Sequence, residues 1–380
     1  MALLHSVSGL LAWLGWYVLP FLVIVSAIVF VHELGHYLVG RWCGVRVDAF
    51  SIGFGPELFA RIDSHGTRWR VGALPLGGYV KFHGDANAAS VDAGPPDPSV
   101  DPARTLAAQP VANRAAIVLA GPVANFILAI VIFTGMFTAF GRPEHAPRIG
   151  RVAPASPAAQ AGFLPGDLVK SVDGEPIGSF EALQEATVLS AGLPMTIIVE
   201  RGGRDVTLTA TPQVSVVDQG VFGKRRMSHL GIGSSTNSND VRIERCGLPV
   251  CLVWGTAQTW AILKGTTAYI VGVFAGRQST DQVSGLIGAA QMAGEIAKIS
   301  VWNLFDWAAL ISASIGFMNL LPIPLLDGGH LVFYAFEAAL GRPLSQRTQE
   351  IGLKIGIALV ATLLVFTTSH DILRIVASGN

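Results

Sequence analysis

The sequence is poor in charged residues. Only 14% of its 380 residues are Asp, Glu, Lys or Arg, whereas 51% are hydrophobic. A soluble domain typically carries about 25% charged residues, so the shortfall indicates segments that never meet water. The formal net charge is zero, which provides no basic surface for a polyanion. We therefore predict no nucleic-acid partner.

Cysteine is also scarce, with three residues and no CxxC pair. This count argues against a disulfide framework and against a thiolate metal site. Cys246 and Cys251 could pair in an oxidising compartment, but we expect two unpaired small residues. The first twenty residues lack Lys and Arg, so the basic region of a signal peptide is missing. We predict that the first apolar run is retained as a membrane span.

Long apolar runs account for the low charge. About 20 residues suffice to cross a bilayer as a helix. We predict that four apolar runs belong to transmembrane helices: 10–39, 115–140, 302–326 and 351–366. A fifth run, 248–274, contains Gln258, Lys264 and several Thr. We predict that it lies along the membrane interface as an amphipathic helix, with a fifth crossing as the alternative. The fold class is thus a polytopic α-helical membrane protein with about four transmembrane helices.

Basic residues beside the runs favour an outer N-terminus under the positive-inside rule. Arg41 and Arg46 follow the first run, and Arg342 and Arg347 follow the run that ends at 326. Both pairs are expected in the cytoplasm. The arginines that follow the second run point the other way: Arg142, Arg148 and Arg151.

Two polar regions separate the runs. Residues 67–83 alternate around Gly77-Gly78, which predicts a membrane-associated β-hairpin or a pair of short strands, and 84–103 have the composition of a disordered linker. Residues 148–212 show an α+β pattern, with strands at 149–152, 168–172, 195–200 and 205–210, a helix starting at Ser156-Pro157 and another at 180–189. The predicted boundaries are 1–140 for an N-terminal membrane half, 141–235 for the α+β domain, 236–300 for an interfacial helical region and 301–380 for a C-terminal membrane half.

The motif HELGH at 32–36 lies inside the first apolar run. On a helix, His32 and His36 share a face and can reach one tetrahedral Zn²⁺. Glu33 is placed to take a proton from the attacking water. Ionisable groups inside a membrane are costly and usually functional. The alternative is a structural role, in which these polar groups only hydrogen-bond to one another within a helix bundle. A soluble metalloprotease with the same motif is the other alternative, and the apolar flank 21–31 argues against it.

Two histidines leave one protein ligand missing, and the run from Asn319 to His330 offers it. Asp327 is an oxygen ligand that suits zinc. Pro322 and Pro324 interrupt the helix before it, and irregular backbone at membrane depth is tolerated where it lines a cavity. His330 is a competing ligand, which we place outside the site.

With these motifs the sequence resembles the site-2 protease family (peptidase family M50), in particular the bacterial regulator-of-sigma-E protease type. The matching pieces are HELGH (32–36), GGYVKF (77–82), GPVANF (121–126), VSGLIGAA (283–290) and NLLPIPLLDGG (319–329). The α+β segment is similar to a PDZ domain. One PDZ-like domain fits here, whereas members of this type are best known with two in tandem.

The resemblance implies a function and a site. His32, His36 and Asp327 would bind Zn²⁺, and Glu33 would act as the general base. Asn319 and the strand residues Gly78, Tyr79 and Val80 would hold the backbone of an extended substrate, a form of β-augmentation.

The implied activity is intramembrane zinc-dependent proteolysis of single-span membrane proteins, such as trimmed anti-sigma factors or signal-peptide remnants. The implied location is the bacterial cytoplasmic (inner) membrane, in contact with membrane lipid, with the PDZ-like domain in the periplasm. Nothing in the sequence indicates an oligomeric state. Two rival functions remain: a PDZ-containing membrane scaffold with an inactive site, and a zinc transporter.

Overall fold

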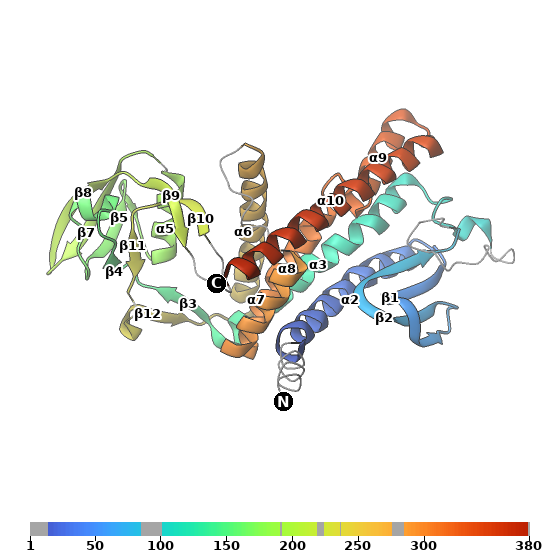
Figure 1. Ribbon diagram of the computed structural model, residues 1–380, viewed down its shortest axis with the longest axis horizontal. Helices are drawn as coiled ribbons and strands as arrows, with labels where there is room; N and C mark the ends of the chain where they lie inside the picture. Colours follow the sequence, from blue (N-terminus) through green and yellow to red (C-terminus); the bar gives the residue numbers. More distant parts are fainter. Residues whose placement is uncertain are drawn as a thin grey trace. The chain divides into compact units, whose positions relative to one another are not determined.

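The computed structural model describes residues 14–84, 101–190, 192–218, 224–235, 237–275 and 285–378. The chain divides into two compact units. The membrane unit comprises residues 1–134, 252–267 and 284–380, and the inserted unit comprises 135–251 and 268–283. Figure 1 follows the elements along the chain. The predicted linker 84–103 lies outside the described residues between 85 and 100.

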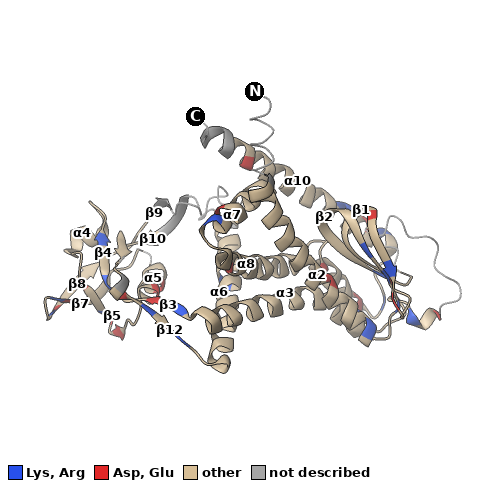
Figure 2. Ribbon diagram, turned by 90° about the horizontal axis from the view of Figure 1, so that it is seen from below, with Lys and Arg blue, Asp and Glu red and all other residues tan. Residues whose placement is uncertain are grey.

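Four helices are long and apolar enough to cross a membrane, which confirms the predicted class. They are α2 (Leu19–Trp42, preceded by a π-helical turn Leu14–Val18), α3 (Val111–Phe140), α8 (Val301–Asn319) and α10 (Gln346–Ser378). Almost no charge is carried by α3 and α8 (Figure 2). Arg114 is the single charged residue of α3 and Asp306 that of α8. Such helices satisfy their own backbone groups, as a bilayer requires.

Three more helices complete the helical part: α6 (Leu248–Phe274), α7 (Leu286–Ile299) and α9 (Asp327–Leu340). The run 248–274 is one helix, as expected, and it is not among the four candidate spans. Its position along the interface stays a prediction. The run 302–326 is helical only to Asn319, because Pro322 and Pro324 lack the N–H that a continuing helix needs.

The β-element of the membrane unit is larger than the segment predicted from the sequence. Residues 67–83 lie in β2 (Arg68–Phe82), which pairs with β1 (Val47–Ile62). Residues 68–71 pair with 49–52 in the same chain direction, whereas 78–82 pair with 47–52 in the opposite direction. The chain therefore reverses between 72 and 78, where Gly77 has φ +89°, as the predicted pair of short strands requires. The strand β1 was not predicted. The two strands lie side by side in Figure 1.

The reversal of the chain between 72 and 78 gives the first part of β1 two neighbours. Phe50 pairs with Trp69 on one side and with Val80 on the other. Residues 78–82 therefore form an outer strand of this sheet, and among the described residues no further strand pairs with their other edge. Aromatic packing anchors the sheet to α2: the ring of Phe50 stacks on Trp69 at 4.3 Å and meets Tyr37 edge-on at 5.8 Å.

The inserted unit contains the predicted α+β domain. Its elements are β3 (Arg142–His145), β4 (Ile149–Val152), α4 (Pro157–Ala161), β5 (Leu168–Val172), β6 (Glu175–Pro176), α5 (Phe180–Leu189), β7 (Met195–Arg201), β8 (Arg204–Ala210), β9 (Gln213–Asp218), β10 (Lys224–His229), β11 (Ile232–Ser234) and β12 (Val241–Glu244). The sheet order is β6-β5-β7-β8, beside the two-stranded pairs β4–β11, β9–β10 and β3–β12.

Local signals predicted this domain well. Ser156 caps α4 by accepting from Ala159 N, and β7 and β8 form the hairpin around Gly202-Gly203. Strand β7 buries the alternate residues Met195, Ile197 and Val199 in one core, which also includes Ile149, Phe163 and Leu183. Two strands close the domain: β10 ends at His229, and β11 pairs with β4 after a turn at Gly231.

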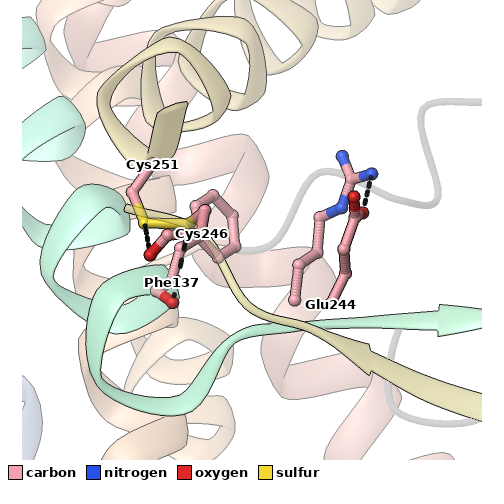
Figure 3. The surroundings of a disulfide bond; sticks show 5 residues. Phe137, Glu244, Cys246 and Cys251 are labelled. Carbon is pink, nitrogen blue, oxygen red and sulfur yellow. Dashed lines mark hydrogen bonds and ion pairs between the residues drawn. A yellow bond between two sulfur atoms is a disulfide. The ribbon is translucent and has the colours of Figure 1, made fainter. Parts of the chain in front are cut away.

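Cys246 and Cys251 form a disulfide, so the prediction of two unpaired cysteines is wrong (Figure 3). The bond joins the connector after β12 to the first turn of α6. Cys246 Sγ lies 3.9 Å from the carbonyl oxygen of Phe137 in the last turns of α3. The pairing was missed because spacing alone does not show that both side chains lie within bonding reach.

A buried ion pair ties the inserted domain together. Asp167, 1% exposed, accepts from Arg201 Nε and Nη2 at 2.7 Å each and from Leu164 N at 2.9 Å. Burial raises the pKa of this carboxyl, but the hydrogen bonds from Arg201 and Leu164 outweigh it and hold the pKa below its ordinary value. The folded state therefore binds fewer protons than the unfolded chain as the pH falls. The stabilisation is fully present above about pH 4 and is lost on further acidification.

Asp167→Asn should cost the domain about 3 kcal/mol at pH 7, because Arg201 loses its charged partner. Thermal unfolding of the full chain in detergent, with proteolysis of the domain as a second probe, measures the loss. Asp205→Asn is the matched control, since Asp205 is exposed and pairs with Lys170 at the surface, and it should change stability by less than about 1 kcal/mol. Equal stability of the two variants would contradict the assignment.

Candidate metal centre

Helix α2 presents the two histidines of HELGH to one point. His32 and His36 stand one turn apart, and their Nε2 atoms are 3.2 Å from each other. Each residue is 8% exposed. The uninterrupted apolar stretch before them favours a continuous helix across this position, so the spacing of four residues becomes a shared face.

Asp327 completes the cluster from a distant part of the chain. It is the first residue of α9, and its Oδ2 lies 3.1 Å from His32 Nε2 and 3.5 Å from His36 Nε2. The next residues are Gly328 and Gly329, where a Cβ would collide with backbone oxygens of the preceding loop. The loop is therefore folded tightly against the start of α9, which directs the carboxylate at the histidines.

These three residues fit a zinc ion. Their ligand atoms all lie within 4.8 Å of one another. Asp327 Oδ2 is buried and has no hydrogen bond of suitable geometry within the described residues. Two imidazole nitrogens and one carboxylate oxygen are a known donor set for catalytic zinc, with the fourth position open to water or substrate. The orphaned oxygen beside two imidazole nitrogens is what a cation would satisfy.

Helix α3 covers the back of the histidines. A Cβ on Gly121 would collide with both imidazole rings. His36 Nδ1 lies 2.8 Å from the carbonyl oxygen of Ile117, and His32 Nδ1 lies 3.2 Å from the amide of Asn125. No role was predicted for these residues from the sequence. The motif GPVANF, which places a glycine and an asparagine inside an apolar helix, was the feature that could have indicated one.

Glu33 and the proposed substrate-holding residues line the same cavity, which has a volume of about 470 Å³. Gly78, Tyr79 and Val80 of β2 and Asn319, the last residue of α8, are in its wall. The backbone of Val80 lies close to the Glu33 carboxylate. A Cβ on Gly78 would lie 2.7 Å from the carbonyl oxygen of Ser51 and 3.1 Å from Glu33 Cγ. The outer strand of the sheet thus lies directly against the proposed base.

His330 is part of this wall but not of the metal cluster. It lies one turn beyond Asp327 on α9, and its ring meets Phe333 edge-on at 6.3 Å. Among the described residues, the cluster of candidate ligands consists of His32, His36 and Asp327. The geometry therefore favours Asp327 over His330 as the third ligand.

An ion pair holds α9 to α3. Both nitrogens of the Arg114 fork bind Glu337, at 3.1 Å and 2.6 Å, and the guanidinium lies 4.9 Å from the centre of the Tyr334 ring. Arg114 Nε donates to the carbonyl oxygen of Gln109. Helix α3 also contacts both histidines. It therefore helps to fix the positions of all three candidate ligands.

Fold and cluster together define a multi-pass membrane protein with a metallopeptidase-type centre, and comparison with known proteins assigns its family. Residues 20–363 match the model described as Peptidase family M50. The chain belongs to this family.

Curated relatives are similar along their whole length. A protein of Rhizobium meliloti (strain 1021), named as a candidate zinc metalloprotease, is 44% identical over 364 residues, which cover 94% of this chain and 96% of that protein. A similarly named protein of Agrobacterium fabrum is 42% identical over 97% of this chain and 99% of its own length. Metalloprotease MmpA of Caulobacter vibrioides is 39% identical, with 93% and 94% covered.

Two solved PDZ domains align with part of the chain. One, from an SdrC-like protein of Listeria monocytogenes, is 18% identical and covers 23% of this chain and 84% of its own, with a TM-score of 0.20. The other, from HtrA3, is 26% identical and covers 19% and 80%, with a TM-score of 0.17.

The chain is therefore a zinc metalloprotease of the site-2 type, embedded in a membrane by several helices and directed at membrane-protein substrates. The predicted enzyme class and the predicted cofactor, Zn²⁺, are confirmed. The rival functions of scaffold and transporter find no support in the family.

Proposed function

We propose that this protease cuts peptide bonds at the membrane with a zinc ion held by His32, His36 and Asp327 and with Glu33 as the general base. The observation that carries the proposal is the convergence of three buried ligand atoms beside Glu33 in one cavity. His32 and His36 lie on α2, a helix that is apolar enough to cross the membrane. Ionisable groups at such a position are rare unless they are functional.

When bound, zinc supplies a Lewis acid that lowers the pKa of water and polarises the scissile carbonyl. Glu33 takes the proton from the attacking water and later gives it to the leaving amine. Because the outer strand of the sheet lies directly against Glu33, a substrate that lies along this strand has its scissile bond close to the base.

The same strand can provide hydrogen bonds to an unwound substrate. In a transmembrane helix each backbone carbonyl accepts a hydrogen bond from the N–H of the residue four positions later. The helix must therefore unwind locally before a peptide bond can be cut. Each exposed amide then costs several kcal/mol in an apolar environment unless it finds a partner. We propose that Gly78, Tyr79 and Val80 pair with the extended segment and that the amide of Asn319 binds its backbone.

The proposed substrates are single-span membrane proteins, such as trimmed anti-sigma factors or signal-peptide remnants. The test is comparative membrane proteomics of a wild-type strain and a Glu33→Gln strain. Stubs of single-span proteins, with most of the soluble part removed, should accumulate several-fold in the variant. If the two membrane proteomes show the same stubs, this substrate class is wrong.

We propose the bacterial cytoplasmic membrane as the location, with the inserted unit on the periplasmic side. The Cys246–Cys251 disulfide supports this side, because disulfides persist in oxidising compartments and are rare in the cytosol. Cys43, which follows the end of α2, is a free thiol.

A labelling experiment tests the orientation. In intact spheroplasts treated with a membrane-impermeant reductant, an impermeant maleimide should label Cys246 and Cys251 but not Cys43. A Cys43→Ser variant should give the same signal. Labelling of Cys246 and Cys251 that needs lysed membranes would place the inserted unit in the cytoplasm.

A further inference from the structure

Asn125 is a fully buried amide in the middle of α3, with 0% exposure. Its backbone carbonyl oxygen accepts from Ser312 Oγ of α8 at 2.8 Å. A Cβ on Gly316, one turn further along α8, would lie 3.1 Å from Asn125 Cβ. The two helices thus enclose the residue, and its side chain has few ways to satisfy three or four hydrogen-bonding sites.

The side chain contacts one of the proposed metal ligands. Its Nδ2 lies 3.2 Å from His32 Nδ1, and its Oδ1 is buried without a hydrogen-bond partner in the described part of the chain. A buried carbonyl left unpaired costs about 1–3 kcal/mol, and such groups are rare in native proteins. The unpaired oxygen therefore requires an explanation.

The proposed metal centre supplies it. His32 Nε2 faces His36 Nε2 and Asp327 Oδ2, so this is the nitrogen that would bind zinc. A ligand nitrogen carries no proton, and a neutral imidazole must then carry its proton on Nδ1. An Nδ1–H needs an acceptor. A half-turn of the carboxamide exchanges its nitrogen and oxygen. It places Oδ1 within reach of that proton and moves Nδ2 to the position that Oδ1 held.

His36 already has this arrangement. Its Nδ1 lies 2.8 Å from the carbonyl oxygen of Ile117, which can only accept. Second-shell acceptors of this kind orient ligating histidines and fix their tautomer.

We infer that Asn125 is a positioning residue for zinc: its amide oxygen accepts a hydrogen bond from His32 Nδ1–H and so presents Nε2 to the metal. This inference rests on the proposed metal centre. With it, α3 provides one acceptor for each histidine, Ile117 for His36 and Asn125 for His32.

The test measures zinc affinity and a spectrum in addition to activity. Full-length protein in detergent is prepared as Asn125→Leu, Asn125→Asp and His32→Ala, with Asn113→Ala as the matched control because Asn113 lies in the first turn of the same helix and donates to Gln109. The zinc dissociation constant is obtained by chelator competition. The visible spectrum of the Co²⁺-loaded protein reports ligand geometry.

Asn125→Leu keeps the branching of the side chain but removes the acceptor, so zinc should bind about 10–100-fold more weakly and the Co²⁺ bands should shift. Asn113→Ala should match wild type. Asn125→Asp should keep zinc affinity within a few-fold, since a carboxylate oxygen also accepts from Nδ1–H.

The outcomes distinguish failure of the proposed metal centre from failure of the role of Asn125. Undiminished zinc affinity in His32→Ala would refute the metal centre itself. Loss of zinc in His32→Ala together with wild-type affinity and spectrum in Asn125→Leu would overturn the role of Asn125 alone. If Asn125→Leu does not fold, the isosteric Asn125→Asp still decides, because loss of zinc there contradicts the inference.

Discussion

Replacing Glu33 with Gln is expected to reduce peptide hydrolysis by about 10²–10⁴-fold while the protein keeps one zinc per chain. An amide cannot take a proton from water, and general-base catalysis contributes a factor of this size to the rate. The three proposed ligands are untouched, and Gln has the size and shape of Glu. The variant should therefore bind metal and substrate as wild type does.

The measurement uses purified protein in detergent, a single-span model substrate and elemental analysis of zinc. Glu350→Gln is the matched control, because Glu350 is an exposed residue of α10 that accepts from Gln346. It should cleave at the wild-type rate. Near-normal turnover by Glu33→Gln would show that another group takes the proton.

Replacing Asp327 with Ala should lower zinc affinity and activity together, each by at least about 100-fold. The helix motif supplies two protein ligands, and a catalytic zinc site of this class uses three. The loss should exceed the 10–100-fold typical of residues that merely orient ligands. Asp327 is also the single negative charge in the cluster, so its removal leaves two neutral imidazoles.

His330→Ala is the control for this variant, since His330 lines the same cavity one turn further along α9. It should retain zinc at the wild-type level. Chelator competition on both proteins decides between the two residues. Tight, full zinc binding by Asp327→Ala combined with loss in His330→Ala would identify His330 as the third ligand.

Local sequence patterns were enough for a large part of this protein. The four apolar runs predicted the spanning helices because length and lack of charge are properties of a continuous segment. His32 and His36 were predictable as a pair, since four residues on a helix always share a face. The strands and caps of the inserted domain followed for the same reason: Ser156, the Gly202-Gly203 turn and the alternation of 168–172 act within a few residues.

The remaining features depend on contacts between segments far apart in the chain. β1 was missed because a strand is stabilised by its partner, and 47–62 finds that partner only in the folded sheet. The Cys246–Cys251 bond depends on how the connector turns into α6. The closeness of Asp327 to His32, and the contact of Asn125 with the same ring, depend on the packing of α9 and α3 against α2. Periodicity within one segment carries no information about the distance between two, so hydrophobic burial and close helix packing set those positions.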